Sequence, residues 1–283
     1  MKKVLFVLIA PLLLTACGGS KKSDSTPEDF KQSYTVDASK KGKKISGQEA
    51  GNIAKEIERK MNERTTESEQ FIEDSKVFSY SFKNVIDDKI YLGSEVNYSS
   101  EEDFFSQRLE VMSEEDESRV HHISTQYEYS IGEEVVFADV NPDGSGHYYT
   151  YSKEGYEYNG IFQFLSEMML ECGNQIKNLL TQMTTYGDMP AGSGVNVEYS
   201  SSGAGNLYMK MQIPSAGITL EALCEDYWLT YEYMYTDMTQ LMKNLPAEYR
   251  DLMEFQRMVT EIHFDFQHAT VERPDLSNLR HLN

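Results

Sequence analysis

The feature that most constrains the fold is a switch to two-residue periodicity that begins near residue 77. From there the chain repeatedly alternates polar residues with aromatic or β-branched ones. This pattern is typical of strands with one face packed against the protein and the other exposed to solvent. The first such segments are Val77–Phe82, Lys89–Tyr98, Gln107–Met112, Val120–Tyr129, Glu134–Val140 and His147–Tyr158. Short polar turns separate them, which predicts an antiparallel meander. Val195–Tyr199, Asn206–Ile213 and Tyr227–Tyr235 continue the pattern later in the chain.

Helical periodicity occurs before and between these strands. Ser46-Gly47-Gln48-Glu49 has the form of a capping box, and apolar residues then recur at helical spacing, which predicts a helix over residues 46–63. A longer apolar stripe predicts a helix over 161–184 that covers the concave side of the sheet. Its inward-facing residues would be Leu165, Met169, Cys172, Ile176 and Leu180. A further helical pattern spans 237–259, and a last strand begins at Ile262.

These patterns together predict an α+β fold. We expect a curved, half-barrel-like antiparallel sheet with an N-terminal helix and with helices packed on one face. No second linker interrupts residues 45–283, so we expect them to form a single domain.

The first residues have the anatomy of a secretory signal. Lys2 and Lys3 precede an apolar run from Val4 to Leu14, and Leu14-Thr15-Ala16-Cys17 ends it with small residues before a cysteine. The run is shorter than the roughly 17–25 residues of a membrane-spanning helix. The last four residues resemble the lipobox of bacterial lipoproteins. The resemblance implies that residues 1–16 are removed, that Cys17 is acylated, and that the chain is anchored to the cell membrane or envelope on the extracytoplasmic side.

Residues 17–44 predict a disordered stalk after the acylated cysteine, because they contain many charges and serines but few large apolar residues. Its lysines would favour an anionic membrane surface, and a plain soluble spacer explains them equally well. The signal carries +2 and the stalk +3, so the total of −20 leaves −25 on residues 45–283. A surface this acidic excludes nucleic acid as a partner, because it repels phosphate.

Two cysteines remain once Cys17 is acylated. Cys172 and Cys224 form an even pair outside the reducing cytosol, so a disulfide is one interpretation. Two buried free thiols that behave as small apolar residues are the other.

The segment that most resembles a metal site is the stretch from Asp139 to Thr150. Asp139, Asn141 and Asp143 have the spacing of an EF-hand calcium loop, but Thr150 stands where a bidentate carboxylate is needed. Asn141-Pro142-Asp143-Gly144 is better explained as a hairpin turn. His121 and His122 are adjacent on a strand pattern, so they point to opposite faces and do not share a metal. We therefore expect no metal site.

The chain also lacks HExxH, GxSxG, CxxC and Gly-rich phosphate-loop motifs. We therefore expect a protein without a cofactor and without enzymatic activity.

Tyrosines concentrate in two of the strand patterns, 147–158 and 227–235. They are explained by sheet packing and cross-strand pairing, or by an aromatic-lined cavity for an apolar or sugar-like ligand.

The order of signal, stalk, helix, meander, helix and returning strands resembles LolA/LppX-type lipoproteins and lipoprotein carriers. The resemblance covers about residues 45–273 in element order only, and the extra helical pattern near 247–258 departs from it. It implies a half-barrel over an apolar cavity, and hence a binding module for a lipid or other hydrophobic ligand. The alternative is a lipoprotein that contacts another envelope protein.

Overall fold

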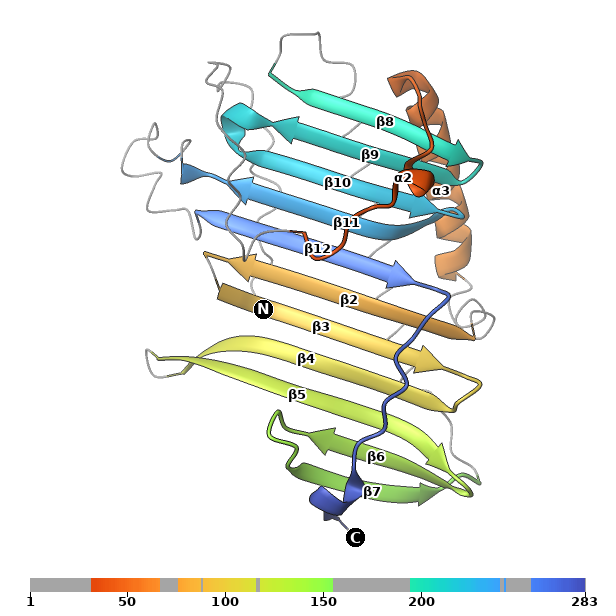
Figure 1. Cartoon of the computed structure of the whole chain (residues 1–283), viewed down its shortest axis with the longest axis vertical. Coiled ribbons are helices and arrows are strands. Elements are labelled where there is room, and N and C mark those ends of the chain that lie inside the picture. The colour runs from red at the N-terminus through yellow and green to blue at the C-terminus, as the bar shows by residue number, and fades with distance from the viewer. Residues whose placement is uncertain are drawn as a thin grey trace.

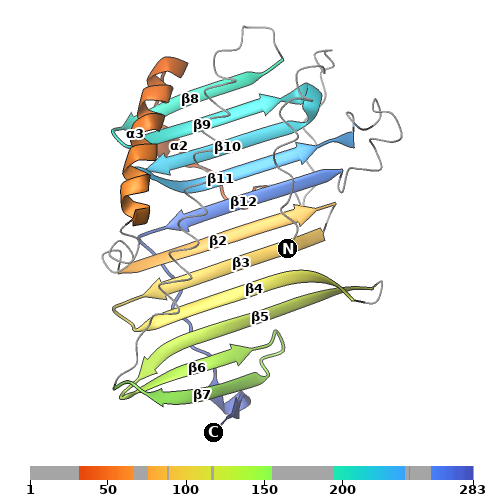
Figure 2. The same ribbon diagram turned by 180° about the vertical axis from the view of Figure 1, so that it is seen from behind.

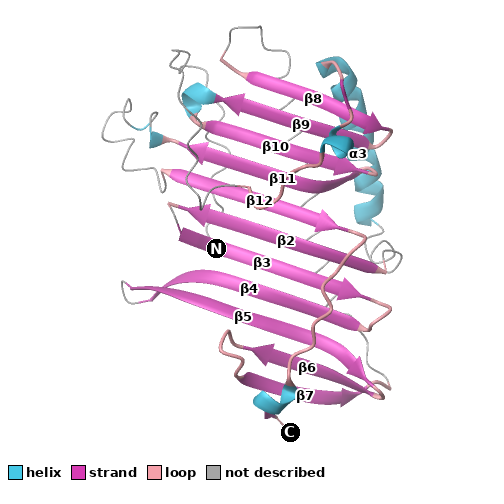
Figure 3. Cartoon of the chain, in the orientation of Figure 1, coloured by secondary structure: helices cyan, strands magenta, loops and turns pink. Residues whose placement is uncertain are grey.

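A single sheet of thirteen strands organises the chain (Figure 1). The computed structural model describes residues 32–66, 76–87, 89–115, 118–154, 194–239, 242 and 256–282. The strand order across the sheet is β1-β8-β9-β10-β11-β12-β2-β3-β4-β5-β6-β7-β13. Strands therefore dominate the described part of the chain (Figure 3).

The helices are α2 (Ala38–Lys41) and α3 (Gly47–Thr66), with 3₁₀ turns at Pro214–Ala216 and Leu276–Asn278. The strands are β1 (Lys43–Lys44), β2 (Val77–Ile86), β3 (Lys89–Ser99), β4 (Phe104–Glu115), β5 (Ser118–Ile131), β6 (Glu134–Val140), β7 (Gly146–Ser152), β8 (Asn196–Gly203), β9 (Asn206–Ile213), β10 (Ile218–Glu225), β11 (Trp228–Asp237), β12 (Arg257–Asp265) and β13 (Arg280–His281).

Two antiparallel meanders are joined into this one sheet by β12. Strands β2 to β7 form the first meander, and β8 to β11 form the second. Strand β12 pairs with β11 on one side and with β2 on the other, so that Ile262 lies between Glu232 and Phe82. The centre of the sheet is thus built from strands that are far apart in the sequence.

Different segments cover the two faces of the sheet. Helix α3 lies on the face seen in Figure 2, where its buried Ala54, Ile57 and Met61 join the largest apolar cluster. On the opposite face, the N-terminal segment (residues 32–44) and the C-terminal segment (residues 266–279) cross the strands (Figure 1). Val36 and Val271 anchor these two segments in separate apolar clusters.

The predicted α+β half-barrel is wrong. The sheet is open and mixed, because β13 runs parallel to β7 while all other neighbours are antiparallel. Closure requires the edge strands to pair with each other, but here two-residue strands, β1 and β13, flank the outer long strands instead. Within the described ranges there are two α-helices, of which α3 confirms the expected N-terminal helix.

Two other expected helices lie wholly or mostly outside the part of the chain that the structure describes. The helix expected over 161–184 lies outside the described residues, and so does most of the pattern at 237–259, although 257–259 belong to strand β12. No described helix is both long enough and apolar enough to cross a bilayer.

The disordered stalk is also wrong for residues 32–44. Asp37 caps α2, Lys43 and Lys44 pair with Ser201 and Ser200 of β8, and Val36 is buried. The rest of the predicted stalk and the signal lie outside the described residues.

Candidate functional site

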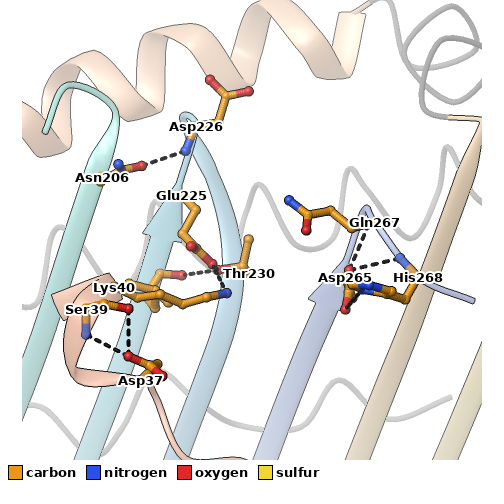
Figure 4. Close-up of polar contacts among 11 residues, drawn as sticks. Asp37, Ser39, Lys40, Asn206, Glu225, Asp226, Thr230, Asp265, Gln267 and His268 are labelled. Atoms are coloured by element: carbon orange, nitrogen blue, oxygen red, sulfur yellow. Dashed lines mark hydrogen bonds and ion pairs between the residues drawn. The ribbon is translucent and has the colours of Figure 1, made fainter. Parts of the chain in front are cut away.

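A pocket of about 600 Å³ opens at one edge of the sheet, where β10 and β12 end and β11 begins. We call it the sheet-end pocket, and Figure 4 shows its polar residues. Its wall combines aromatic and charged side chains from four parts of the chain. The aromatic residues are Tyr34, Trp228, Phe264 and Phe266. The charged or titratable ones are Lys40, Arg64, Glu225, Asp226, His263, Asp265 and His268.

A strained turn between β10 and β11 forms one rim of the pocket. Its two central residues, Asp226 and Tyr227, both have positive φ, as a two-residue hairpin of type I′ requires. Aspartate tolerates this conformation, but a bulky tyrosine adopts it at a cost of about 1–3 kcal/mol. Hydrogen bonds from the Asp226 amide to Asn206 Oδ1 (2.8 Å) and from the Tyr227 amide to the Gly205 carbonyl (2.9 Å) hold the turn.

Helix α3 contacts the same turn through Arg64, the basic residue in its last turn. Arg64 donates to the backbone carbonyl of Asp226 at 2.6 Å and to its carboxylate at 3.1 Å. Because Arg64 is mostly buried whereas the Asp226 side chain is 84% exposed, the arginine fixes the turn while the carboxylate stays open to a ligand.

A second polar group is centred on Glu225. Its Oε2 accepts from Lys40 Nζ and from Thr230 Oγ1, each at 3.0 Å (Figure 4). Burial opposes the charge on Lys40, but the hydrogen bond and attraction to Glu225 outweigh it and raise the pKa of Lys40. Helix α2, which carries Lys40, is capped by Asp37 through Ser39 (2.7 Å to the amide). This lysine therefore stays charged beside the pocket.

A third polar group lies on the other side of Figure 4, at the end of β12. Asp265 Oδ1 accepts from the amides of Gln267 (2.8 Å) and His268 (3.1 Å), and its Oδ2 lies 3.0 Å from His268 Nδ1. Burial raises the pKa of Asp265, but these hydrogen bonds outweigh it and lower that pKa overall. The carboxylate is thus ionised and holds the turn that follows β12 at the pocket.

The aromatic residues that line the pocket contact one another. Trp228 meets Phe264 edge-on at 6.1 Å and Phe266 edge-on at 6.3 Å, while the two phenylalanine rings are parallel at 5.9 Å. On the opposite face, Tyr34 stacks on His263 at 4.3 Å, and burial lowers the pKa of that histidine. Trp228 is the only tryptophan of the chain, so the pocket has its own fluorescent reporter.

The N-terminal segment holds Tyr34 and Lys40 at the pocket because two buried glutamates bind it. Glu261 accepts from the Ser33 amide (2.9 Å) and hydroxyl (2.6 Å), and from the Tyr34 amide (3.2 Å). Glu221 accepts from Gln32 at 3.0 Å. Burial raises the pKa of Glu221, but the hydrogen bonds from Gln32 and Tyr208 and two nearby lysines outweigh it and lower that pKa. Both glutamates are only 4% exposed.

The residues predicted from sequence lie elsewhere. Cys17 and Cys172 are outside the described residues. Cys224 is a free cysteine with no exposed surface, and burial raises the pKa of its thiol to about 12. The disulfide with Cys172 stays a prediction.

Within the stretch from Asp139 to Thr150, residues 141–145 form the hairpin turn between β6 and β7. Ser145 donates to the Asp143 carboxylate and accepts, through its carbonyl, from the Asn141 amide. His121 and His122 follow each other on β5, opposite Met112 and Val111. The hydrogen bonds agree with the predicted turn, and both histidines lie on a strand as expected.

The tyrosines of the two tyrosine-rich segments differ in how far they are buried. Tyr231, Tyr233 and Tyr235 belong to a buried cluster, whereas Tyr151 is 53% exposed. The aromatic pattern predicted at 227–235 includes Trp228, but its neighbours Lys40, Arg64 and Asp265 were missed, because only the tertiary fold brings them together.

No protein-family model matches the chain, and no curated protein is significantly similar to it.

Proposed function

We propose that this chain is a lipid-anchored extracytoplasmic binding module and that the sheet-end pocket holds a small amphiphilic ligand. The pocket is the observation that carries the proposal. Its volume of about 600 Å³ falls in the roughly 300–1,000 Å³ range of small-molecule sites. Aromatic walls with a few polar groups are typical of such sites.

The wall chemistry supports an amphiphile more than a wholly apolar molecule. Phe266 and Tyr34 are half-buried, so part of each ring is available to an apolar ligand group. Around them, Lys40, Asp226 and Asp265 offer charges of both signs. A ligand with an apolar body and a polar head would use both kinds of contact.

Anchoring at Cys17 supports the same role. Fourteen residues, 18–31, separate Cys17 from the docked N-terminal segment. Fully extended, they span at most about 50 Å. A ligand released from a membrane would therefore meet the pocket close to its source.

The test uses Trp228 as an energy donor to dansyl-undecanoic acid, a fluorescent amphiphile. We expect saturable transfer at one molecule per chain. Phe266→Ala should weaken binding about tenfold, because it removes roughly 1–2 kcal/mol of apolar contact. The matched control Leu109→Ala alters a residue that is 37% exposed and lies outside the pocket wall, and it should leave binding unchanged.

The proposal is wrong if transfer does not saturate and if mass spectrometry of the protein isolated from membranes finds no co-purified compound. Equal affinity of the Phe266→Ala variant would instead move the ligand away from this pocket.

A further inference from the structure

The edge of the sheet at β7 is incompletely paired. Strand β7 has seven residues, but β13 pairs only with His147 and Tyr148. Residues 149–152 therefore form an outer edge within the described part of the sheet (bottom of Figure 1).

The outward-pointing backbone groups on this edge can be identified. The Leu282 amide donates to the Tyr148 carbonyl at 2.8 Å, so the backbone groups of Tyr148 point away from β6. In a strand, residues two apart point the same way. The N–H and C=O groups of Thr150 and Ser152 therefore also face outward, beyond the stretch that β13 covers.

A hollow of about 460 Å³ lies along this edge, and aromatic and apolar side chains share its lining with polar ones. It is lined by Tyr149, Thr150, Tyr151, His281 and Leu282. Tyr151 is 53% exposed and Leu282 is 37% exposed. Tyr149 and Tyr151 are held by Phe137, which stacks on the first at 5.3 Å and meets the second edge-on at 5.7 Å. The hollow thus offers aromatic and apolar contacts to a side chain, beside outward-facing backbone groups that pair with no described strand.

Acidic residues flank one end of the edge. Glu134 pairs in register with Ser152, the Glu133 carbonyl accepts from the Lys153 amide, and Glu154 follows directly. All three glutamates are exposed. Residues 45–283 also carry a net charge of −25. Two copies would repel each other at this edge, whereas a basic partner would be attracted.

We propose that the β7 edge is a docking site for an extended, basic-ended peptide segment of another protein, which adds a strand beside Thr150 and Ser152. Backbone hydrogen bonds would supply part of the affinity. An apolar side chain of the segment would fill the hollow at Tyr149 and Tyr151. Its lysines or arginines would lie near Glu133, Glu134 and Glu154. This role is separate from ligand binding in the sheet-end pocket.

The probe is a fluorescein-labelled peptide of alternating valine and threonine with two lysines at one end, made with the lysines first and with the lysines last. We expect one order to bind the full chain in an anisotropy titration, because the acidic end fixes its direction. Replacing the lysines by glutamates, or N-methylating alternate amides, should each weaken binding at least tenfold.

Two variants locate the site. Thr150→Pro removes an outward N–H on an edge where proline is tolerated, and Tyr151→Glu places a charge at the hollow. Each should weaken binding at least tenfold with little change in melting temperature, while Leu109→Glu, an exposed control on β4, should not.

Equal binding of the lysine and glutamate peptides, or undiminished binding by both edge variants, would overturn the proposal. So would sedimentation showing a dimer of the chain that Thr150→Pro dissociates, because the edge would then belong to a second copy.

Discussion

The most quantitative prediction concerns Glu232, a glutamate in the middle of β11. Its side chain lies on the face of the sheet opposite the N-terminal segment, in register between Ala222 and Ile262, and is 8% exposed. Its Oε2 accepts no hydrogen bond from the residues that the structure describes. Burial raises the pKa of Glu232 to about 7. We expect Glu232→Gln to stabilise the fold at neutral and alkaline pH.

The size of the effect follows from the two pKa values. The gap between about 7 in the folded chain and the ordinary 4.5 corresponds to about 3 kcal/mol, at roughly 1.4 kcal/mol per pKa unit. Below pH 4.5 the carboxyl is neutral in both states and nothing is lost. Between pH 4.5 and 7 the unfolded chain releases its proton first, so stability falls as pH rises. Above pH 7 the full penalty is present.

Urea unfolding followed by Trp228 fluorescence at pH 5, 6, 7 and 8 measures this effect. The free energy of unfolding of Glu232→Gln should exceed that of the unmodified chain by about 3 kcal/mol at pH 8, and by much less at pH 5. Glu134→Gln, at an exposed position, controls for the loss of one charge. A difference that is the same at every pH would refute the reasoning, because the carboxyl would then titrate normally.

Three further predictions concern other parts of the chain. Cys17→Ala should abolish palmitate labelling and membrane retention, and continued labelling would exclude the lipoprotein assignment. Because Cys224 is a free cysteine in the structure, thiol titration in denaturant should give equal counts with and without reductant, and a rise of two on reduction would instead establish the bridge. Glu261→Ala should cost about 3 kcal/mol and speed hydrogen exchange at residues 33–36, because the Ser33 and Tyr34 amides lose their charged acceptor, whereas Glu134→Ala should do neither.

The separate strands were largely predictable, because their alternation is a local property. Val77–Phe82 and Asn206–Ile213 lie within or coincide with real strands. Strand β10 was missed because Leu220, Ala222 and Leu223 have no β preference, and Glu221 interrupts the apolar pattern. Pairing with β9 and β11 overrides that local preference.

The arrangement of the strands was not predictable from the same patterns. Alternation says which residues share a face, but it does not say which strands are neighbours. The position of β12 between β11 and β2 joins the two meanders and places Asp265 near Trp228. The sheet-end pocket depends on this order, so it was beyond sequence reasoning.

The N-terminal segment was misjudged because its composition is that of a linker, while its partners are buried in the sheet. A buried carboxylate without donors costs several kcal/mol. Tyr208 and Tyr231 donate to Glu221 and Glu261 from within the sheet, and further donors come from outside it. Gln32, Ser33 and Tyr34 supply them. The same segment then places Tyr34 and Lys40 at the pocket. Release of the segment would therefore expose two buried glutamates and remove one pocket wall together, which ties the integrity of the pocket to the docking of the stretch that follows the proposed lipid anchor.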